Sequence, residues 1–158
     1  MSTSDAVALM VASGMITVVI LLALLVYVLT VIAYWKMFTK AGEAGWKSII
    51  PFLNVYTLYK MTWASKFFYV WLGLNVVSIV CSNIADNSAA SVIGGLVGLG
   101  LFVLHILSCS KLSKAYGKGT GTTVGLIFLN TIFILILGFG DAAYVGPDGQ
   151  PAQQNTQG

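Results

Sequence analysis

Long apolar stretches separated by short charged segments dominate this sequence. Four stretches carry no charged residue, and they cover residues 6–35, 67–85, 87–110 and 119–140. A helix needs about 20 apolar residues to cross the roughly 30 Å hydrocarbon core of a bilayer. The most apolar part of each stretch therefore predicts a transmembrane helix, at about residues 12–35, 67–85, 90–109 and 122–140.

The loop between the first two predicted helices is about 30 residues long, which is more than a simple connection needs. Its uncharged block, residues 48–59, is too short to cross a bilayer as a helix. Ile49, Leu53 and Tyr56 recur at near-helical spacing, and Pro51 stands where the first turn of a helix tolerates proline. We expect an interfacial or re-entrant helix over residues 46–60. A cap packed over the inner end of the helix bundle is the alternative.

The composition is typical of a protein surrounded by lipid. Of the 158 residues, 58% are hydrophobic and 8% are charged, whereas soluble domains have about 25% charged residues. The predicted fold is an all-α integral membrane domain over residues 1–145, with four transmembrane helices and one interfacial or re-entrant helix.

Residues 146–158 contain no large apolar side chain, so we expect a disordered tail. A tether for a partner outside the cell is the alternative for this tail.

The distribution of charge predicts the orientation of the helices. All eight lysines lie within two segments, residues 36–66 and 111–118, and four of the five acidic residues lie outside them. Positive residues in short loops stay on the cytoplasmic side of a membrane. We therefore expect both lysine segments inside and both termini outside. Lysines attract anionic headgroups, so anionic lipids at the cytoplasmic face are expected partners.

The residue types argue against several classes of function. The chain has no arginine, the residue that base readout and bidentate phosphate binding favour, so we expect no nucleic-acid partner. One histidine and two widely separated cysteines make neither a zinc site nor a catalytic acid–base pair. We therefore expect a protein that is not an enzyme and that holds no metal ion and no cofactor.

A few polar residues lie inside the predicted helices. His105 is the one ionisable residue among them, and Asn75, Ser78 and Asn130 add hydrogen-bonding groups. Polar groups that face lipid leave hydrogen bonds unsatisfied, so we expect these side chains to form an internal polar cluster or line a narrow cavity. For His105 we favour a hydrogen-bonded packing role, with a proton relay or ligand as the alternative.

Glycines give the third predicted helix a narrow face. Gly94 and Gly98 are four residues apart, a spacing that lets a second helix approach closely. We favour packing within the chain over a seam between two copies.

Two segments carry more specific motifs. The first contains Lys40-Ala-Gly-Glu-Ala-Gly-Trp-Lys-Ser-Ile-Ile-Pro-Phe-Leu-Asn54. The second contains Lys114-Ala-Tyr-Gly-Lys-Gly119, then Ile136-Leu-Gly-Phe-Gly140, then Tyr144-Val-Gly-Pro147. Both resemble a bacterial family of small integral membrane proteins of unknown function, whose loop reads K-A-G-x-x-G-W-x-x-I-I-P-x-x-N. That family often has a proline where this chain has Phe128-Leu-Asn130, so we expect a less kinked fourth helix.

The resemblance implies a membrane domain in a bacterial plasma membrane and no defined activity. A similar domain stands ahead of the peptidase domain in some signal peptidase I proteins, which implies a link to protein export. The loop between the first two predicted helices is rich in Gly, Trp and Tyr and is longer than a connection needs. We therefore favour a scaffold or regulator of a membrane partner. The candidate partner or lipid surface consists of Lys40, Gly42, Gly45, Trp46, Lys47, Pro51, Asn54 and Lys60. The alternative is a small transporter or channel formed by several copies, a homo-oligomer with the polar cluster along its pathway.

Overall fold

The computed structural model describes residues 2–83 and 88–149, and all regular structure in these two ranges is helical. The long helices are α1 (Thr3–Lys40), α3 (Lys66–Asn83) and α4 (Ser88–Ala115). The shorter ones are α2 (Pro51–Thr62), α5 (Thr120–Phe128) and α6 (Asn130–Phe139), with the 3-10 helices η1 (Gly45–Ser48) and η2 (Pro147–Gly149). The expected outer loop with Asp86 and most of the expected tail, residues 84–87 and 150–158, lie outside the described residues.

Local signals at both ends explain the extent of α1. At its start the Ser2 hydroxyl accepts a hydrogen bond from the Asp5 backbone, and the Asp5 carboxylate accepts one from the Ser2 backbone. At its end Gly42 has a φ of +76°, and the Glu43 N–H donates to the Phe38 carbonyl at 2.8 Å. This is the Schellman arrangement, which ends helices at a glycine. With 38 residues, α1 is about 57 Å long at 1.5 Å per residue.

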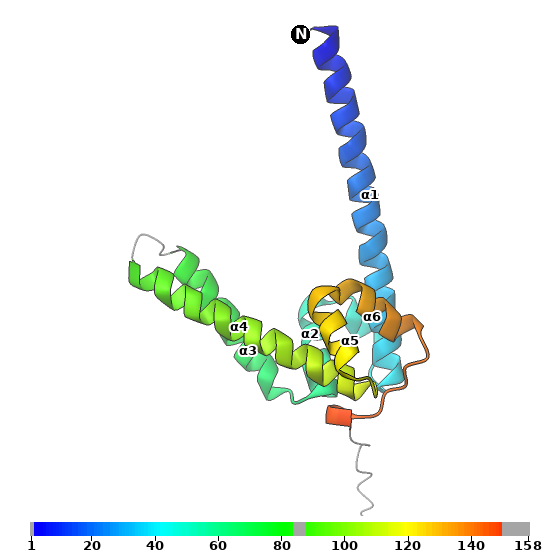
Figure 1. Ribbon diagram of the computed structural model, residues 1–158, viewed down its shortest axis with the longest axis vertical. Coiled ribbons are helices and arrows are strands. Elements are labelled where there is room, and N and C mark those ends of the chain that lie inside the picture. The colour runs from blue at the N-terminus through cyan, green and yellow to red at the C-terminus, as the bar shows by residue number, and fades with distance from the viewer. Residues whose placement is uncertain (1, 84–87, 150–158) are drawn as a thin grey trace, which may run out of the picture.

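Two apolar arms project from one end of the molecule (Figure 1). One arm is α1, and the other is the hairpin of α3 and α4, which run side by side and diverge from α1. All three helices are long and apolar enough to cross a membrane. The most apolar 18-residue window of α1 is 0% buried, and those of α3 and α4 are 6% and 17% buried. Apolar surface exposed on this scale is compatible with a membrane protein.

The fourth apolar stretch does not form one helix. It is broken at Leu129 (φ −125°, ψ 47°), which separates α5 from α6. The Phe133 ring lies where a β-carbon on Gly125 would stand, so this glycine lets the chain fold back on itself. The Asn130 amide donates to the Leu126 carbonyl at 3.2 Å, a local bond that competes with a continuous helix.

The prediction of one continuous, less kinked helix over about 122–140 is therefore wrong. The α5 and α6 helices have 9 and 10 residues, and neither is long enough to cross a bilayer, which takes about 20 residues. The break arises without a proline, from a glycine and an asparagine placed five residues apart.

The interior of the protein lies where α2, α5 and α6 gather around the C-terminal ends of α1 and α4 (Figure 1). We call these parts, with η1 and η2, the end assembly. Gly138 makes a close helix contact in it, because a β-carbon there would lie 2.7 Å from the Ala33 Cα. The buried Tyr116 hydroxyl donates to the Met37 carbonyl at 2.7 Å. A shared core contains Ala33, Met37, Phe38, Met61, Cys109, Leu112, Ala115, Tyr116, Leu126, Ile134, Leu137 and Ala142.

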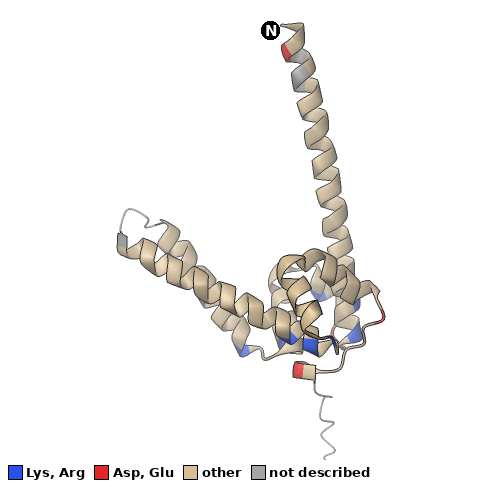
Figure 2. Cartoon of the chain, viewed as in Figure 1, with Lys and Arg blue, Asp and Glu red and all other residues tan. Residues whose placement is uncertain are grey.

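The lysines gather at the end assembly, away from the tips of the two arms (Figure 2). The chain that follows α6 stays at this same end. The Tyr144 hydroxyl donates to the Met61 carbonyl at 2.5 Å, and Asp148 forms an ion pair with Lys111. The charge distribution predicted that the C-terminal segment lies on the opposite face from the lysines. The structure brings the two together, because α6 returns toward the end of α1 instead of crossing to the other side.

Candidate functional site

Glu43 holds the predicted partner loop in place. Its carboxylate accepts hydrogen bonds from Lys47 at 2.6 Å and from Lys60 at 2.7 Å, and its side chain is only 16% exposed. The bond from Lys47, followed by that from Lys60, holds the pKa of Glu43 below its ordinary value. The same contact with Glu43 raises the pKa of Lys60. Glu43 was not among the predicted site residues, although it is the one acidic residue within the lysine segments.

Lys40 is turned toward the protein and not toward a partner. Its ammonium group donates to the carbonyls of Leu137 at 2.9 Å and Gly140 at 2.7 Å, at the end of α6. A cation at this position satisfies carbonyls that the last helical turn leaves unpaired and interacts favourably with the helix dipole. Of the predicted loop lysines, Lys40, Lys47 and Lys60 all therefore have partners inside the end assembly.

The remaining predicted loop residues shape the chain. Gly45 is buried, and the Trp35 indole occupies the place where its β-carbon would be. Pro51 is the first residue of α2, where its missing N–H costs no helical hydrogen bond. The Asn54 amide donates to the Ser48 carbonyl at 3.4 Å. The expected helix over residues 46–60 is thus present as η1 followed by α2.

The turn from η1 into α2 leaves four large apolar side chains open. Trp46 is 50% exposed, Ile49 54%, Ile50 43% and Phe52 63%. We call these four residues the loop surface. The other end of α2 is buried, and this helix packs against α3 and α4. Within the molecule α2 therefore resembles the cap that was the alternative expectation, with an exposed apolar edge at its start.

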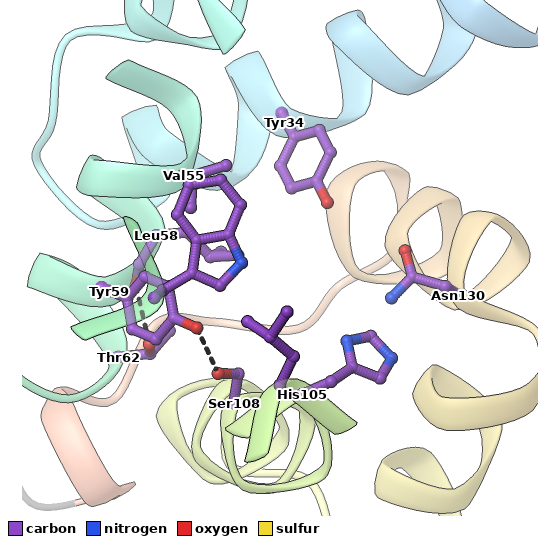
Figure 3. Close-up of a pocket in the computed structure, with 10 residues that line it drawn as sticks. Tyr34, Val55, Leu58, Tyr59, Thr62, His105, Ser108 and Asn130 are labelled. Carbon is purple, nitrogen blue, oxygen red and sulfur yellow. Dashed lines mark hydrogen bonds between the residues drawn. The ribbon is translucent and has the colours of Figure 1, made fainter. Parts of the chain in front are cut away.

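A cavity of about 240 Å³ lies in the end assembly between the two arms (Figure 3). The hydroxyls of Tyr59 on α2 and Ser108 on α4 are hydrogen-bonded at 3.1 Å beside it. Tyr34, His105 and Asn130 point into the same space from α1, α4 and α6. The full lining consists of Tyr34, Val55, Leu58, Tyr59, Thr62, Trp71, Leu101, His105, Ser108 and Asn130.

The structure brings together two of the four residues of the predicted polar cluster. His105 and Asn130 both line the cavity. Asn75 lies on α3 and donates to the Trp71 carbonyl at 2.7 Å, and neither it nor Ser78 is among the described lining residues. Four hydroxyl groups that were not predicted for the site, from Tyr34, Tyr59, Thr62 and Ser108, and the Trp71 indole also belong to the wall. Of these, only Ser108 had a local signal, since it lies three residues after His105 on one helix face.

The polar side chains around the cavity are hydrogen-bonding groups. The His105 Nε2 lies 3.7 Å from the Cys109 sulfur, but Cys109 is only 3% exposed, so its thiol is closed to a substrate. In the part of the chain that the structure describes, no three His, Cys, Asp or Glu side chains lie close enough to hold a metal ion. No charged side chain is found among the described residues that line the cavity.

The predicted glycine face of α4 divides between two environments. A β-carbon on Gly94 would lie 3.7 Å from the Cys81 β-carbon of α3, so this glycine stands at the contact within the hairpin. A β-carbon on Gly98 would have no described atom within 4 Å. Only the first of the two glycines therefore contributes to packing between α3 and α4.

A family model described as a family of unknown function (DUF5684) matches residues 46–147. This match covers more than half of the chain, and the chain therefore belongs to that family. The matched region extends from η1 through α6 and includes the loop surface and most of the cavity wall. No curated protein matches the chain, and no solved structure matches it.

Proposed function

We propose that this member of the family is a non-enzymatic integral membrane protein that scaffolds or regulates a membrane partner. The contrast between the arms and the end assembly carries this proposal. The arms bury very little of their surface within the chain, whereas the end assembly has a packed core and internal ion pairs. The arms accordingly serve as the anchor in lipid, and the end assembly is the working part.

The lysines support a placement of the end assembly at the cytoplasmic face of a bacterial plasma membrane. With α1, α3 and α4 as three spans, the N-terminus lies outside, and the segment from α5 to Gly149 lies inside. Lys114 and Lys118 are exposed, and each cation near an anionic leaflet contributes about 1 kcal/mol of attraction. Anionic lipids are thus the proposed surroundings of the end assembly.

The loop surface is the proposed contact with the partner. Energetically important residues at protein interfaces are often aromatic anchors, and a preorganised surface loses less entropy on binding. Trp46 and Phe52 supply the aromatic groups, while the Glu43 ion pairs fix the loop that carries them. The resemblance to a domain found ahead of some signal peptidase I proteins favours a component of the export machinery as this partner.

Copurification from cross-linked membranes tests the proposal. The affinity-tagged full chain is expected to retain a membrane protein of the export machinery. Replacing Trp46 and Phe52 together by alanine should reduce its yield by about tenfold or more, because each anchor contributes over about 1 kcal/mol. The matched control replaces Ile79 and Leu96, which lie on the arms and are 63% and 64% exposed, by alanine. A partner yield that is unchanged by the Trp46 and Phe52 replacements, or that falls equally in the control, would contradict the proposal.

A small oligomeric transporter or channel is the second candidate. The observation that favours it is the meeting of His105 and Asn130 in one cavity. A density map of the purified protein distinguishes the two candidates. A ring of copies around a hydrated axis lined by these residues supports the channel, whereas a monomer with a dry centre supports the scaffold.

A further inference from the structure

We propose that the cavity between the arms binds the uncharged, hydroxyl- or ester-bearing end of a lipid of the diacylglycerol type. This inference rests on the membrane placement proposed above, but it does not depend on the scaffold role. Three observations carry it: the polar groups of the wall, the surroundings of the opening, and the size of the cavity.

The wall offers hydrogen bonds without charge. Tyr34, His105 and Asn130 direct a hydroxyl, an imidazole and an amide into the space (Figure 3), and the Tyr59–Ser108 hydroxyl pair lies beside them. A charged ligand group would be buried there without a partner, which is costly. A neutral group that both donates and accepts hydrogen bonds, such as the free hydroxyl and esters of a glycerol lipid, matches this wall.

The opening of the cavity faces apolar surface. His105 and Asn130 are exposed members of the lining, whereas Tyr59 is only 5% exposed, so the mouth lies between α4 and the start of α6. Two exposed apolar residues stand close to them in the sequence: Phe102, three residues before His105, is 56% exposed, and Phe128, two residues before Asn130, is 79% exposed. A water-filled mouth would not favour such neighbours, because exposed apolar side chains lose free energy in water. A mouth that opens into the acyl chains of a bilayer does favour them.

The size of the cavity selects the end of a larger molecule. Pockets that enclose whole drug-sized ligands measure about 300–1,000 Å³, and this cavity measures about 240 Å³. It is partly open, so a longer ligand extends out of it. The exposed apolar residues of α1 and α4 provide the surface along which two acyl chains lie.

Photolabelling of the full chain tests this inference. The purified protein is placed in phosphatidylcholine vesicles that contain a trace of diacylglycerol with a photoreactive group at its glycerol end. Parallel samples contain a photoreactive anionic phosphatidylglycerol or a photoreactive alkane. Labelled peptides are identified by mass spectrometry. The expected result is preferential diacylglycerol labelling of α4 near Leu101 and Ser108, above the labelling by either other probe.

Two substitutions remove hydrogen-bonding groups from the wall. His105→Leu and Asn130→Leu should each lower diacylglycerol labelling of α4 by about threefold to tenfold, which is the effect of one lost hydrogen bond. The matched control is Asn83→Leu. Like Asn130, Asn83 is exposed and donates to the carbonyl four residues earlier, at 2.7 Å from Ile79, but it lies outside the described cavity wall. Because Asn130 stands at the helix break, the His105 variant tests the wall without altering that break.

Each contrary outcome has a distinct meaning. Equal labelling of the wild type and both wall variants would overturn the lipid pocket, as would stronger labelling of α4 by the anionic probe. Labelling of α1 by the alkane shows whether the protein is in the bilayer at all. Its absence would remove the membrane placement, whereas its presence without α4 labelling would remove only the pocket.

Discussion

Lys111 and Asp148 form an ion pair that joins the last turns of α4 to η2, 37 residues further along the chain. A backbone bond supports it, because the Val145 N–H donates to the Ala115 carbonyl at 2.8 Å. The chain between these contacts forms α5, which ends at Leu129, and then α6, which packs against α1. The segment before η2 therefore stays with the lysines, and we expect a membrane experiment to find the two on one side.

Single-cysteine labelling should place Lys114 and Asp148 on one side of the membrane. The test uses a chain in which both native cysteines are replaced by alanine. With a membrane-impermeant maleimide, Ser2→Cys should react in intact cells, whereas Lys114→Cys and Asp148→Cys should react only after permeabilisation. The physical reason is that the three proposed spans would leave the start of α1 and η2 at opposite faces. Reaction of Asp148→Cys from the same side as Ser2→Cys would restore a fourth crossing.

Glu43→Gln should destabilise the end assembly by about 1–3 kcal/mol, the effect of losing hydrogen bonds to charged groups in a partly buried site. The comparison is Asp148→Asn, which breaks a more exposed pair (40% for the Asp148 side chain) and should cost at most about 1 kcal/mol. Unfolding by a denaturing detergent, followed by tyrosine and tryptophan fluorescence, measures both. Equal effects of the two substitutions would contradict the central role of Glu43.

Acid should remove the same stabilisation from the wild type. Because the folded protein lowers the pKa of Glu43, its contribution is fully present above the ordinary value of 4.5 and is lost as the pH falls through the folded pKa. The pKa of Lys60 is raised, so its contribution is present below its ordinary pKa and is lost only at strongly alkaline pH. The unfolding midpoint of the wild type should therefore fall on acidification below about pH 4.5, and Glu43→Gln should lack this component.

The arms could be predicted from the sequence because their cause is local. Length, apolar content and the absence of charge define α1, α3 and α4, and Pro51 marks the start of α2. The break at Leu129 was missed because it depends on a contact between side chains. The Phe133 ring must lie against Gly125, and hydropathy does not contain that information.

The candidate site was only half predictable for a related reason. His105 and Asn130 stand out because they are polar residues within apolar stretches. Tyr34 and Tyr59 have no such contrast in the sequence, and they reach the cavity only because α1 and α2 pack together at one end of α4. The role of Lys40 was also hidden, since its two acceptors lie 97 and 100 residues away.

Lys40→Met should loosen the contact between α1 and α6 and cost about 2 kcal/mol. Methionine keeps the apolar length of the side chain but leaves the Leu137 and Gly140 carbonyls without their charged donor. The control is Lys118→Met, because Lys118 is exposed and has no side-chain partner among the described residues. Detergent unfolding midpoints compare the two variants. An effect of Lys118→Met as large as that of Lys40→Met would mean that net charge, and not the cap of α6, determines stability.

Gly138→Ala should separate α6 from α1. A β-carbon at position 138 would lie 2.6 Å from the Ala33 carbonyl oxygen and 2.7 Å from its Cα, and backbone atoms cannot move aside as a flexible side chain can. Overpacking of this kind typically costs about 1–3 kcal/mol. Gly98→Ala is the matched control, because that site on α4 is open and alanine favours a helix over glycine by up to about 1 kcal/mol. Protection of α6 amides in hydrogen exchange should fall in the first variant and stay unchanged in the second. A loss of stability at Gly98 would instead show that this glycine faces a second helix, such as one from another copy of the chain.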